Sequence, residues 1–239
     1  MNLKLTLLGI FFSINIFSQT KDSTASKDNF DFEKPVFHSK EIIVPATMML
    51  AGVAINGNQD NSIKNQVKDW RNDKMPNFRT HIDDVLQFVP YISVYGLEML
   101  GMKPEHDWKN QTAILVKSHI INLGVCYIIK KAVHDTRPDN TALSFPSGHT
   151  AEAFAGATMV SMEYGKRYKW VPYAAFGTAS VVGAFRIANN RHYLSDVLFG
   201  AGLGILSTKL AYWTHQYKWN KNKTPTTWTD PLDGKVYSK

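Results

Sequence analysis

Apolar residues gather in six segments along the chain, separated by shorter polar stretches. The segments are residues 42–56, 84–101, 111–133, 149–165, 171–186 and 194–214. Their apolar positions follow helical spacing, and the sequence contains neither a clear strand pattern nor an internal repeat. The pattern therefore predicts an all-α fold, a six-helix bundle that forms one domain over residues 41–214.

The polar stretches around these segments have distinct characters. Residues 57–83 are strongly polar, but three apolar side chains within them fall at helical spacing: Ile63, Val67 and Trp70. This spacing predicts a small amphipathic helix. We interpret residues 20–40 as a polar leader, and residues 215–239, which contain two prolines and several lysines, as an irregular polar tail.

The first 19 residues have the organisation of a secretory signal peptide. A lysine at position 4 precedes an apolar run over residues 5–17, and the polar residues Ser18 and Gln19 follow it. The run is shorter than the ~20 residues that a spanning helix needs, so a signal peptide over residues 1–19 is favoured over a membrane anchor. The rest of the chain is therefore expected to be exported to the periplasm or cell envelope.

Three short motifs, each at a predicted helix end, carry the candidate chemistry. They are KKAVHDTRP at residues 130–138, PSGH at residues 146–149 and RIANNRHYLSD at residues 186–196. Lys130 and Arg137 lie seven residues apart, which places them two turns apart on one face if the helix continues to Arg137. The first motif therefore brings two cations to the C-terminal end of one helix, and Pro138 ends that helix.

The second motif has the features of a helix start. Ser147 is a good N-cap residue, and the backbone N–H groups of Gly148 and His149 fall in a first turn, where they have no partner within the helix. Unpaired N–H groups beside cations form an anion site.

The third motif pairs a histidine with a carboxylate. His192 and Asp196 are four residues apart, so on a helix Asp196 can accept the Nδ1 hydrogen of His192 and leave Nε2 free as a base or nucleophile. Arg186 adds a planar, permanently charged group that suits phosphate.

In this order, the patterns K-x6-R-P, P-S-G-H and R-x5-H-x3-D resemble the signature of the type 2 phosphatidic acid phosphatase superfamily. That superfamily includes lipid phosphatases, bacterial class A acid phosphatases and vanadium haloperoxidases. Through the helix pattern, the resemblance extends over residues 41–213. It implies a helical bundle of that type and a phosphate-binding set made of Lys130, Arg137, Ser147, Gly148 and Arg186.

The resemblance also implies three catalytic roles. His192 would attack phosphorus, Asp196 would orient His192, and His149 would act as the general acid. One position departs from the family pattern, because a serine usually precedes the last arginine and this chain has Phe185 there. One hydroxyl contact to phosphate is therefore in question, whereas the charged set is complete.

These residues predict a metal-independent phosphomonoesterase that works through a phosphohistidine intermediate and needs no cofactor. Neither HYLSD nor PSGH has the spacing of a metal site, so protein cations and helix-end N–H groups must neutralise the phosphate. The expected substrate is a lipid phosphate or another envelope phosphoester. Two alternatives stay open: a vanadium-dependent haloperoxidase that holds vanadate in the same pocket, and a non-catalytic envelope protein that binds anions.

Charge and the remaining residues change this picture little. The formal net charge of +7 is spread along the chain, which suits anionic lipid or phosphate substrates, and no nucleic-acid motif is present. The lone Cys126 cannot form an intramolecular disulfide. Three residues are assigned no function: His119 is interpreted as a core residue, His134 as a solvent-facing loop residue and Arg191 as a surface cation.

Polar residues within the apolar segments decide whether the helices are expected to cross a membrane. Lys117, Glu152 and Lys209 lie within them, and a charge at depth costs ~2.5–3.5 kcal/mol in lipid. No segment offers about 20 clean apolar residues, and the basic loop GKRYKW would lie outside if an exported chain spanned six times. These features predict an exported bundle that rests on a membrane surface through Trp170, Tyr173 and Trp213. The alternative is an integral inner-membrane protein.

Overall fold

The computed structural model describes residues 38–57, 59–216, 228–229 and 236–237. The predicted signal peptide, most of the predicted leader and most of the predicted tail lie outside the described residues. Within the tail, the two-residue strands β1 (Trp228–Thr229) and β2 (Val236–Tyr237) pair antiparallel.

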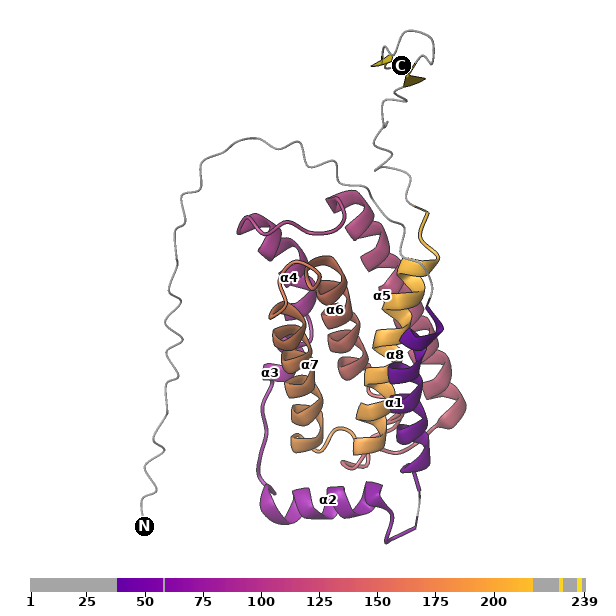
Figure 1. The fold of residues 1–239 in the computed structure, drawn as a ribbon. Helices are drawn as coiled ribbons and strands as arrows, with labels where there is room; N and C mark the ends of the chain where they lie inside the picture. The colour runs from indigo at the N-terminus through magenta and orange to yellow at the C-terminus, as the bar shows by residue number, and fades with distance from the viewer. Residues whose placement is uncertain (1–37, 58, 217–227, 230–235, 238–239) are drawn as a thin grey trace, which may run out of the picture. The chain divides into compact units, whose positions relative to one another are not determined.

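Apart from an isolated β-bridge between Thr136 and Ala142, all other secondary structure in the described part of the chain is helical (Figure 1). In chain order the elements are the 3-10 helix η1 (Ser39–Ile42) and the α-helices α1 (Ile43–Ala54), α2 (Ile63–Lys74), α3 (Ile82–Leu86), α4 (Val89–Met99), α5 (Trp108–Val133), α6 (Gly148–Tyr164), α7 (Val171–Ala188) and α8 (Leu194–Trp213). The prediction of an all-α fold is confirmed, and α2 is the small amphipathic helix expected between the first two apolar segments.

The second predicted segment, residues 84–101, is not one continuous helix. It divides into α3 and α4, with Gln87 and Phe88 between them. Pro90, in the first turn of α4, has no backbone N–H, and in a continuous helix its ring would clash with the carbonyl of Leu86. The break separates the short helix α3, which carries two aspartates, from the longer α4.

Helices α6 and α8 form the centre of the bundle, and most residues of both are buried. Two glycines of α8 allow them to approach closely. A Cβ atom on Gly200 would lie 2.6 Å from Ser147 O, and one on Gly204 would lie 2.1 Å from Ala151 O. Small residues at such positions let helix backbones pack against each other. This contact places the start of α6, which carries the second motif, beside the first half of α8. The third motif ends within the first turn of α8.

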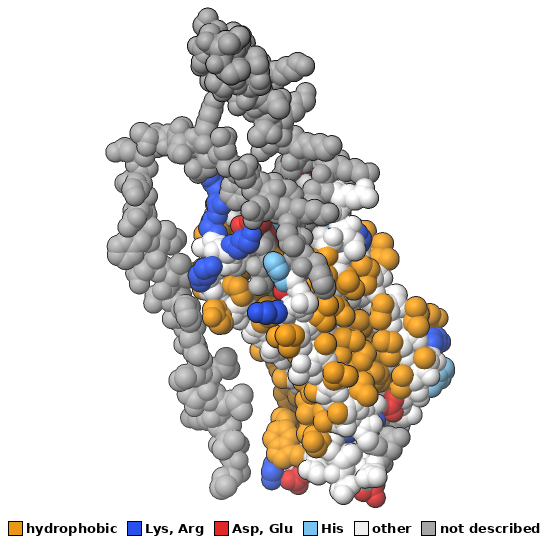
Figure 2. Space-filling model, turned by 45° about the vertical axis from the view of Figure 1, so that its right-hand side comes forward, with side chains coloured by type: hydrophobic (Ala, Val, Ile, Leu, Met, Phe, Trp, Pro, Cys, Tyr) orange, Lys and Arg blue, Asp and Glu red, His pale blue; other side chains and the backbone are white. Residues whose placement is uncertain are grey.

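The outer surface of the bundle is broadly apolar. Figure 2 shows apolar side chains covering much of one face, with few charged side chains among them. Exposed apolar residues on α1 and α5 include Val44, Leu50, Ile120 and Ile128. Helices α5, α7 and α8 are each long and apolar enough to cross a membrane. The expectation that no segment offers such a stretch is therefore wrong for these three helices, and the bundle is membrane-associated.

Hydrogen bonds between polar side chains explain why polar residues in the apolar segments are compatible with membrane-spanning helices. The Glu152 carboxylate is almost completely buried and lies 2.7 Å from Asn122 Nδ2 and 2.8 Å from His119 Nδ1. Lys117 is half-buried, and its Nζ donates to Thr214 O at 2.8 Å in an exposed hydrogen bond. Polar groups in membrane helices are tolerated when they face the bundle interior and pair with one another. A cost of membrane insertion that is counted from the sequence alone is therefore too high.

Candidate active site

The three motifs meet at one end of the bundle. The end of α5 carries Lys130, and the start of α6 carries Ser147 and His149. A hydrogen bond of 3.0 Å from Ser147 N to Asp196 O joins the second motif to the third. A pocket of about 440 Å³ lies among them. It is lined by Arg79, Thr80, His81, Asp84, Arg137, Asp139, His149, Arg186, Asn189 and Arg191.

His192 and Asp196 form a buried pair, with exposed fractions of 2% and 0%. His192 Nδ1 lies 3.2 Å from Asp196 Oδ2. The Asp196 carboxylate also accepts hydrogen bonds from Ser144 Oγ, from Tyr193 N at 3.0 Å and from Ser195 Oγ at 3.2 Å. A carboxylate with this many donors stays ionised, so it keeps the hydrogen of His192 on Nδ1 and leaves the Nε2 lone pair available.

This contact is made at a helix start and not along one helix face. Helix α8 begins at Leu194, so His192 precedes it, and Asp196 is the third residue of the helix, where its carboxylate accepts from the backbone of Tyr193. The four-residue spacing therefore brings the pair together through the capping of α8, whereas the sequence pattern suggested helical periodicity.

Burial controls the protonation of His192. Desolvation lowers the pKa of His192 to about 4, while the neighbouring Asp196 carboxylate acts in the opposite direction and Lys130 and Arg186 lower the pKa further. The imidazole is therefore neutral at the pH values at which a histidine in water would begin to charge. A neutral imidazole is the form that can attack phosphorus.

The pH dependence of turnover should reflect this shift. We expect kcat/KM for a soluble phosphomonoester to persist well below pH 6.5 and to fall only as the pH approaches about 4. The second ionisation of the phosphomonoester itself, at about pH 6, also affects this profile. Repeating the measurement with an ester of lower second pKa distinguishes the ionisation of the substrate from that of the enzyme. An enzymatic limb that stays near pH 6.5 with both esters would contradict a buried, neutral His192.

The same shift affects stability and so requires a control. Because the native pKa of His192 is depressed, its contribution to folding stability is present above pH 6.5 and is lost as the pH falls toward about 4. Circular dichroism across the same range must therefore show that the loss of activity precedes unfolding.

The two cations of the first motif do not share a helix face. Helix α5 ends at Val133, and His134 follows in the left-handed conformation with φ of 52°. Arg137 therefore reaches the pocket from the loop after α5, which corrects the expectation of one helix that continues to Arg137. His134 is exposed, as predicted.

Lys130 supports the loop that leads to the second motif. Its Nζ donates to the carbonyl oxygens of Leu143 and Ser144 at 2.8 and 3.1 Å. An ammonium group has three donors, so one remains for an anion. Lys130 thus both adds charge and holds in place the segment that carries Ser144, the hydroxyl donor to Asp196.

Arginines are crowded around the pocket. Burial, together with repulsion from Arg191 and Arg186, lowers the pKa of Arg137. In the described part of the chain, Arg137 Nε and Arg186 Nε are buried without a hydrogen-bond partner. Buried donors without partners are costly, and repulsion between cations falls when an anion lies among them. These features favour the binding of a phosphate group.

The start of α6 adds backbone donors. Ser147 is the N-cap residue, as predicted, but its Oγ lies 2.9 Å from Thr150 Oγ1 and does not cap the helix. Gly148 is the first helical residue. Because no side chain takes up the first N–H groups of α6, they are available to an anion.

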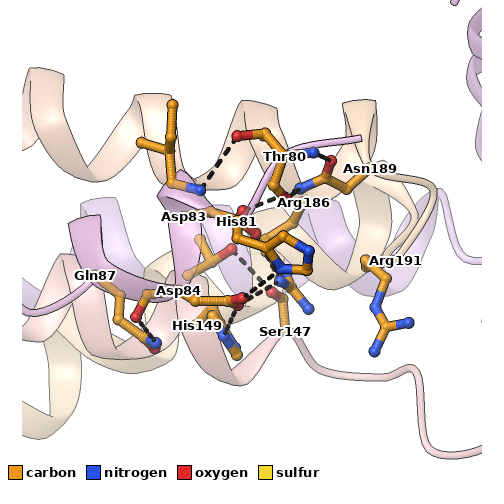
Figure 3. Close-up of polar contacts among 12 residues, drawn as sticks. Thr80, His81, Asp83, Asp84, Gln87, Ser147, His149, Arg186, Asn189 and Arg191 are labelled. Carbon is orange, nitrogen blue, oxygen red and sulfur yellow. Dashed lines mark hydrogen bonds and ion pairs between the residues drawn. The ribbon is translucent and has the colours of Figure 1, made fainter. Parts of the chain in front are cut away.

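Two acidic residues of α3, Asp83 and Asp84, belong to the site although the sequence analysis did not select them (Figure 3). Asp83 is fully buried and accepts from Arg186 Nη1 at 2.6 Å and from Asn189 Nδ2 at 2.9 Å. Asp84 Oδ1 lies 3.0 Å from His149 Nε2 and 3.5 Å from Arg186 Nη1. Asp83 therefore fixes the arginine. Burial and the nearby Arg186 lower the pKa of His149, and the Asp84 carboxylate opposes this shift by stabilising the protonated imidazole.

The sequence offers only a weak signal for these two aspartates. They precede the first motif by more than 40 residues, and acidic residues in the first turn of a helix are explained by the helix dipole alone. Arg191 is exposed, as its interpretation as a surface cation predicts, but it also lines the pocket, and its Nη1 lies 3.0 Å from Asp139 Oδ2. Phe185 stacks on Phe78, with ring centroids 6.2 Å apart, so it supplies no polar contact.

Comparison with known proteins places this site in a family. The sequence profile of the PAP2 superfamily matches residues 111–220, which contain all three motifs. The region that carries the three motifs therefore matches the PAP2 superfamily, as those motifs predict.

Individual relatives cover different shares of the chain. It is 38% identical over 154 residues to the lipid A 1-phosphatase of Porphyromonas gingivalis, a match that covers 64% of this chain and 35% of that protein. It is 25% identical over 150 residues to phosphatidylglycerophosphatase B of Bacillus subtilis, covering 57% of this chain and 71% of that one. The crystal structure of Aquifex aeolicus LpxE aligns with a TM-score of 0.49 and 20% identity, covering 64% of this chain and 97% of that chain. The chain thus spans about a third of the length of its P. gingivalis relative.

Proposed function

We propose that this protein is a metal-independent phosphatase that removes a phosphate group from a membrane lipid. The observation that carries the proposal is the buried pair of His192 and Asp196 beside a pocket lined by arginines. Binding an anion needs cations and N–H groups but no oriented imidazole. The pair therefore favours catalysis over simple anion binding.

The reaction proceeds in two steps. His192 Nε2 attacks phosphorus in line, the bond between phosphorus and the leaving oxygen breaks, and His149 donates a proton to that oxygen. His149, now neutral, then takes a proton from water, whose oxygen attacks the phosphohistidine and releases inorganic phosphate. Arg137, Arg186 and the N–H groups at the start of α6 neutralise the charge on the equatorial oxygens in both steps.

Several features favour a lipid as the substrate. The named relatives include a lipid A 1-phosphatase and a phosphatidylglycerophosphatase. Helices α5, α7 and α8 have the length and composition of membrane spans, and the first and third motifs of the site lie at their ends. A headgroup phosphate lies at the ends of spanning helices, at the depth of such a pocket. We therefore favour the integral arrangement over a bundle that lies wholly in the periplasm.

A phosphate-release assay on dispersed lipid phosphates tests this function. The purified protein should release inorganic phosphate from phosphatidate, phosphatidylglycerophosphate or lipid A in the presence of EDTA, and vanadate, which resembles the five-coordinate phosphoryl group, should inhibit it. Among the described residues, no group of three or more His, Cys, Asp and Glu side chains could hold a metal ion. Activity that EDTA removes and Mg²⁺ or Zn²⁺ restores would contradict the proposal, as would vanadate-dependent bromination without phosphate release.

A further inference from the structure

An apolar groove lies between α4 and α7 and shares no lining residue with the catalytic pocket. It has a volume of about 190 Å³ and is lined mainly by apolar side chains. We call it the α4–α7 groove and define it by Val89, Pro90, Leu97, Val160, Ala174 and Thr178. No charged residue lines it. Small side chains of α7 leave this space open, because Ala174 and Thr178 stand where larger residues would fill it.

The groove begins close to the catalytic pocket and runs away from it along the helices. In the chain, Val89 at its near end follows Asp84 of the pocket by five residues, and Phe88 between them is exposed. On α7, Thr178 precedes Arg186 by eight residues, which is about 12 Å along a helix. Val89 and Leu97 are also about 12 Å apart along α4. Figure 1 shows α3, which carries Asp84 of the pocket, beside α7.

This direction matches the path of a lipid tail. A lipid whose phosphate occupies the pocket must send its acyl chains toward the bilayer interior, along helices that cross the membrane. Helix α7 is one of the candidate spans. A groove that is apolar, that begins about 12 Å along α7 from Arg186 of the pocket and that follows such a helix therefore has the chemistry and the direction of an acyl-chain site.

We propose that the α4–α7 groove binds the first part of one acyl chain of the lipid substrate. This inference rests on the proposed function. Because the bilayer is itself apolar, moving a chain from lipid into the groove gains little hydrophobic free energy. The groove acts instead by orientation: a chain held along α7 fixes the glycerol or sugar end of the substrate, and with it the phosphate relative to His192.

Two substitutions on α7 form a matched test. Thr178 lines the groove and Ser180 does not, and each donates to the carbonyl four residues before it, Thr178 Oγ1 to Ala174 at 3.0 Å and Ser180 Oγ to Phe176 at 2.8 Å. Thr178→Phe fills the groove, and Ser180→Phe adds the same ring outside it. Both variants and the wild type are assayed on long-chain phosphatidate in mixed micelles and on p-nitrophenyl phosphate.

The informative quantity is the ratio of kcat/KM for phosphatidate to kcat/KM for p-nitrophenyl phosphate. Thr178→Phe should lower this ratio by about tenfold or more, because a misplaced substrate reacts slowly, whereas Ser180→Phe should change it by less than about twofold. An unchanged ratio in Thr178→Phe would overturn the inference, and so would an equal fall in both variants. Absence of activity on both substrates in the wild type would instead refute the proposed function.

A milder variant decides the matter if Thr178→Phe fails to fold. Ala174 is exposed on the groove side of α7, so Ala174→Leu narrows the groove without disturbing the core. The wild type should use long-chain phosphatidate better than a four-carbon analogue, and Ala174→Leu should reduce that preference. A preference that Ala174→Leu leaves unchanged would show that the chain does not lie in the groove.

Discussion

Replacing His192 by alanine should lower kcat for phosphate release by about 10³-fold or more, as removal of a nucleophile does in other hydrolases. The imidazole supplies the atom that bonds to phosphorus, and none of the neighbouring cations can replace it. Phosphate release from a soluble phosphomonoester under saturating substrate measures the effect. Turnover within about tenfold of the wild type would remove His192 from the reaction.

The fold should survive this substitution. Asp196 loses one partner but keeps hydrogen bonds from Ser144, Tyr193 and Ser195, so its buried carboxylate remains satisfied. The matched control is His134→Asn, because His134 is a histidine of the same end of the bundle that lies outside the pocket lining. Asparagine tolerates its left-handed backbone. The control should retain activity within about twofold.

Arg186→Lys should lower kcat by about 10²-fold although it keeps the positive charge. Arg186 Nη1 is committed to Asp83 at 2.6 Å, and the planar group directs its other nitrogens elsewhere. Lysine offers one ammonium group, which cannot keep the buried Asp83 paired and also hold two phosphate oxygens. Phe185 supplies no hydroxyl that could share this contact. Steady-state kinetics should show a smaller change in KM than in kcat, because orientation in the transition state is lost.

Arg79→Lys provides the control for this experiment. Arg79 lines the same pocket, but in the described structure the hydrogen bond of its Nη1 goes to the neighbouring carbonyl of Phe78. It should keep kcat within about threefold of the wild type. Near-normal kcat in Arg186→Lys would mean that Arg186 is a peripheral cation, whereas equal losses in both variants would indicate a general need for guanidinium groups at the pocket.

The sequence predicts the motifs well because they are local. A spacing of four residues can bring His192 and Asp196 into contact at a helix start as well as along a helix face. Ser147 is recognisable as an N-cap because it is a polar residue that directly precedes an apolar run. Pro90 shows the opposite case, since its position within an apolar segment marks a helix break that hydrophobic spacing alone hides.

Residues that reach the site through tertiary packing are not visible in the sequence. Asp83 and Asp84 contact Arg186 and His149 only because α3 packs against α6 and α7, and nothing local distinguishes them from a helix start. The same holds for Glu152. In the sequence it is a charged residue within an apolar segment, and only the packing of α5 shows that His119 and Asn122 pair with it. Pairing between distant segments decides both the contents of the pocket and the cost of placing the helices in a membrane.

Whether His192 takes up the phosphoryl group is tested most directly by trapping the phosphorylated protein. The wild type is mixed with a phosphate-labelled lipid substrate, quenched with base within the first turnover and digested. We expect the label on the peptide that contains His192, in a form stable to base and lost in acid, as a phosphorus–nitrogen bond should be. The label should be absent from His192→Ala. Label on another residue, or turnover with no labelled protein at any time, would contradict a phosphohistidine at His192.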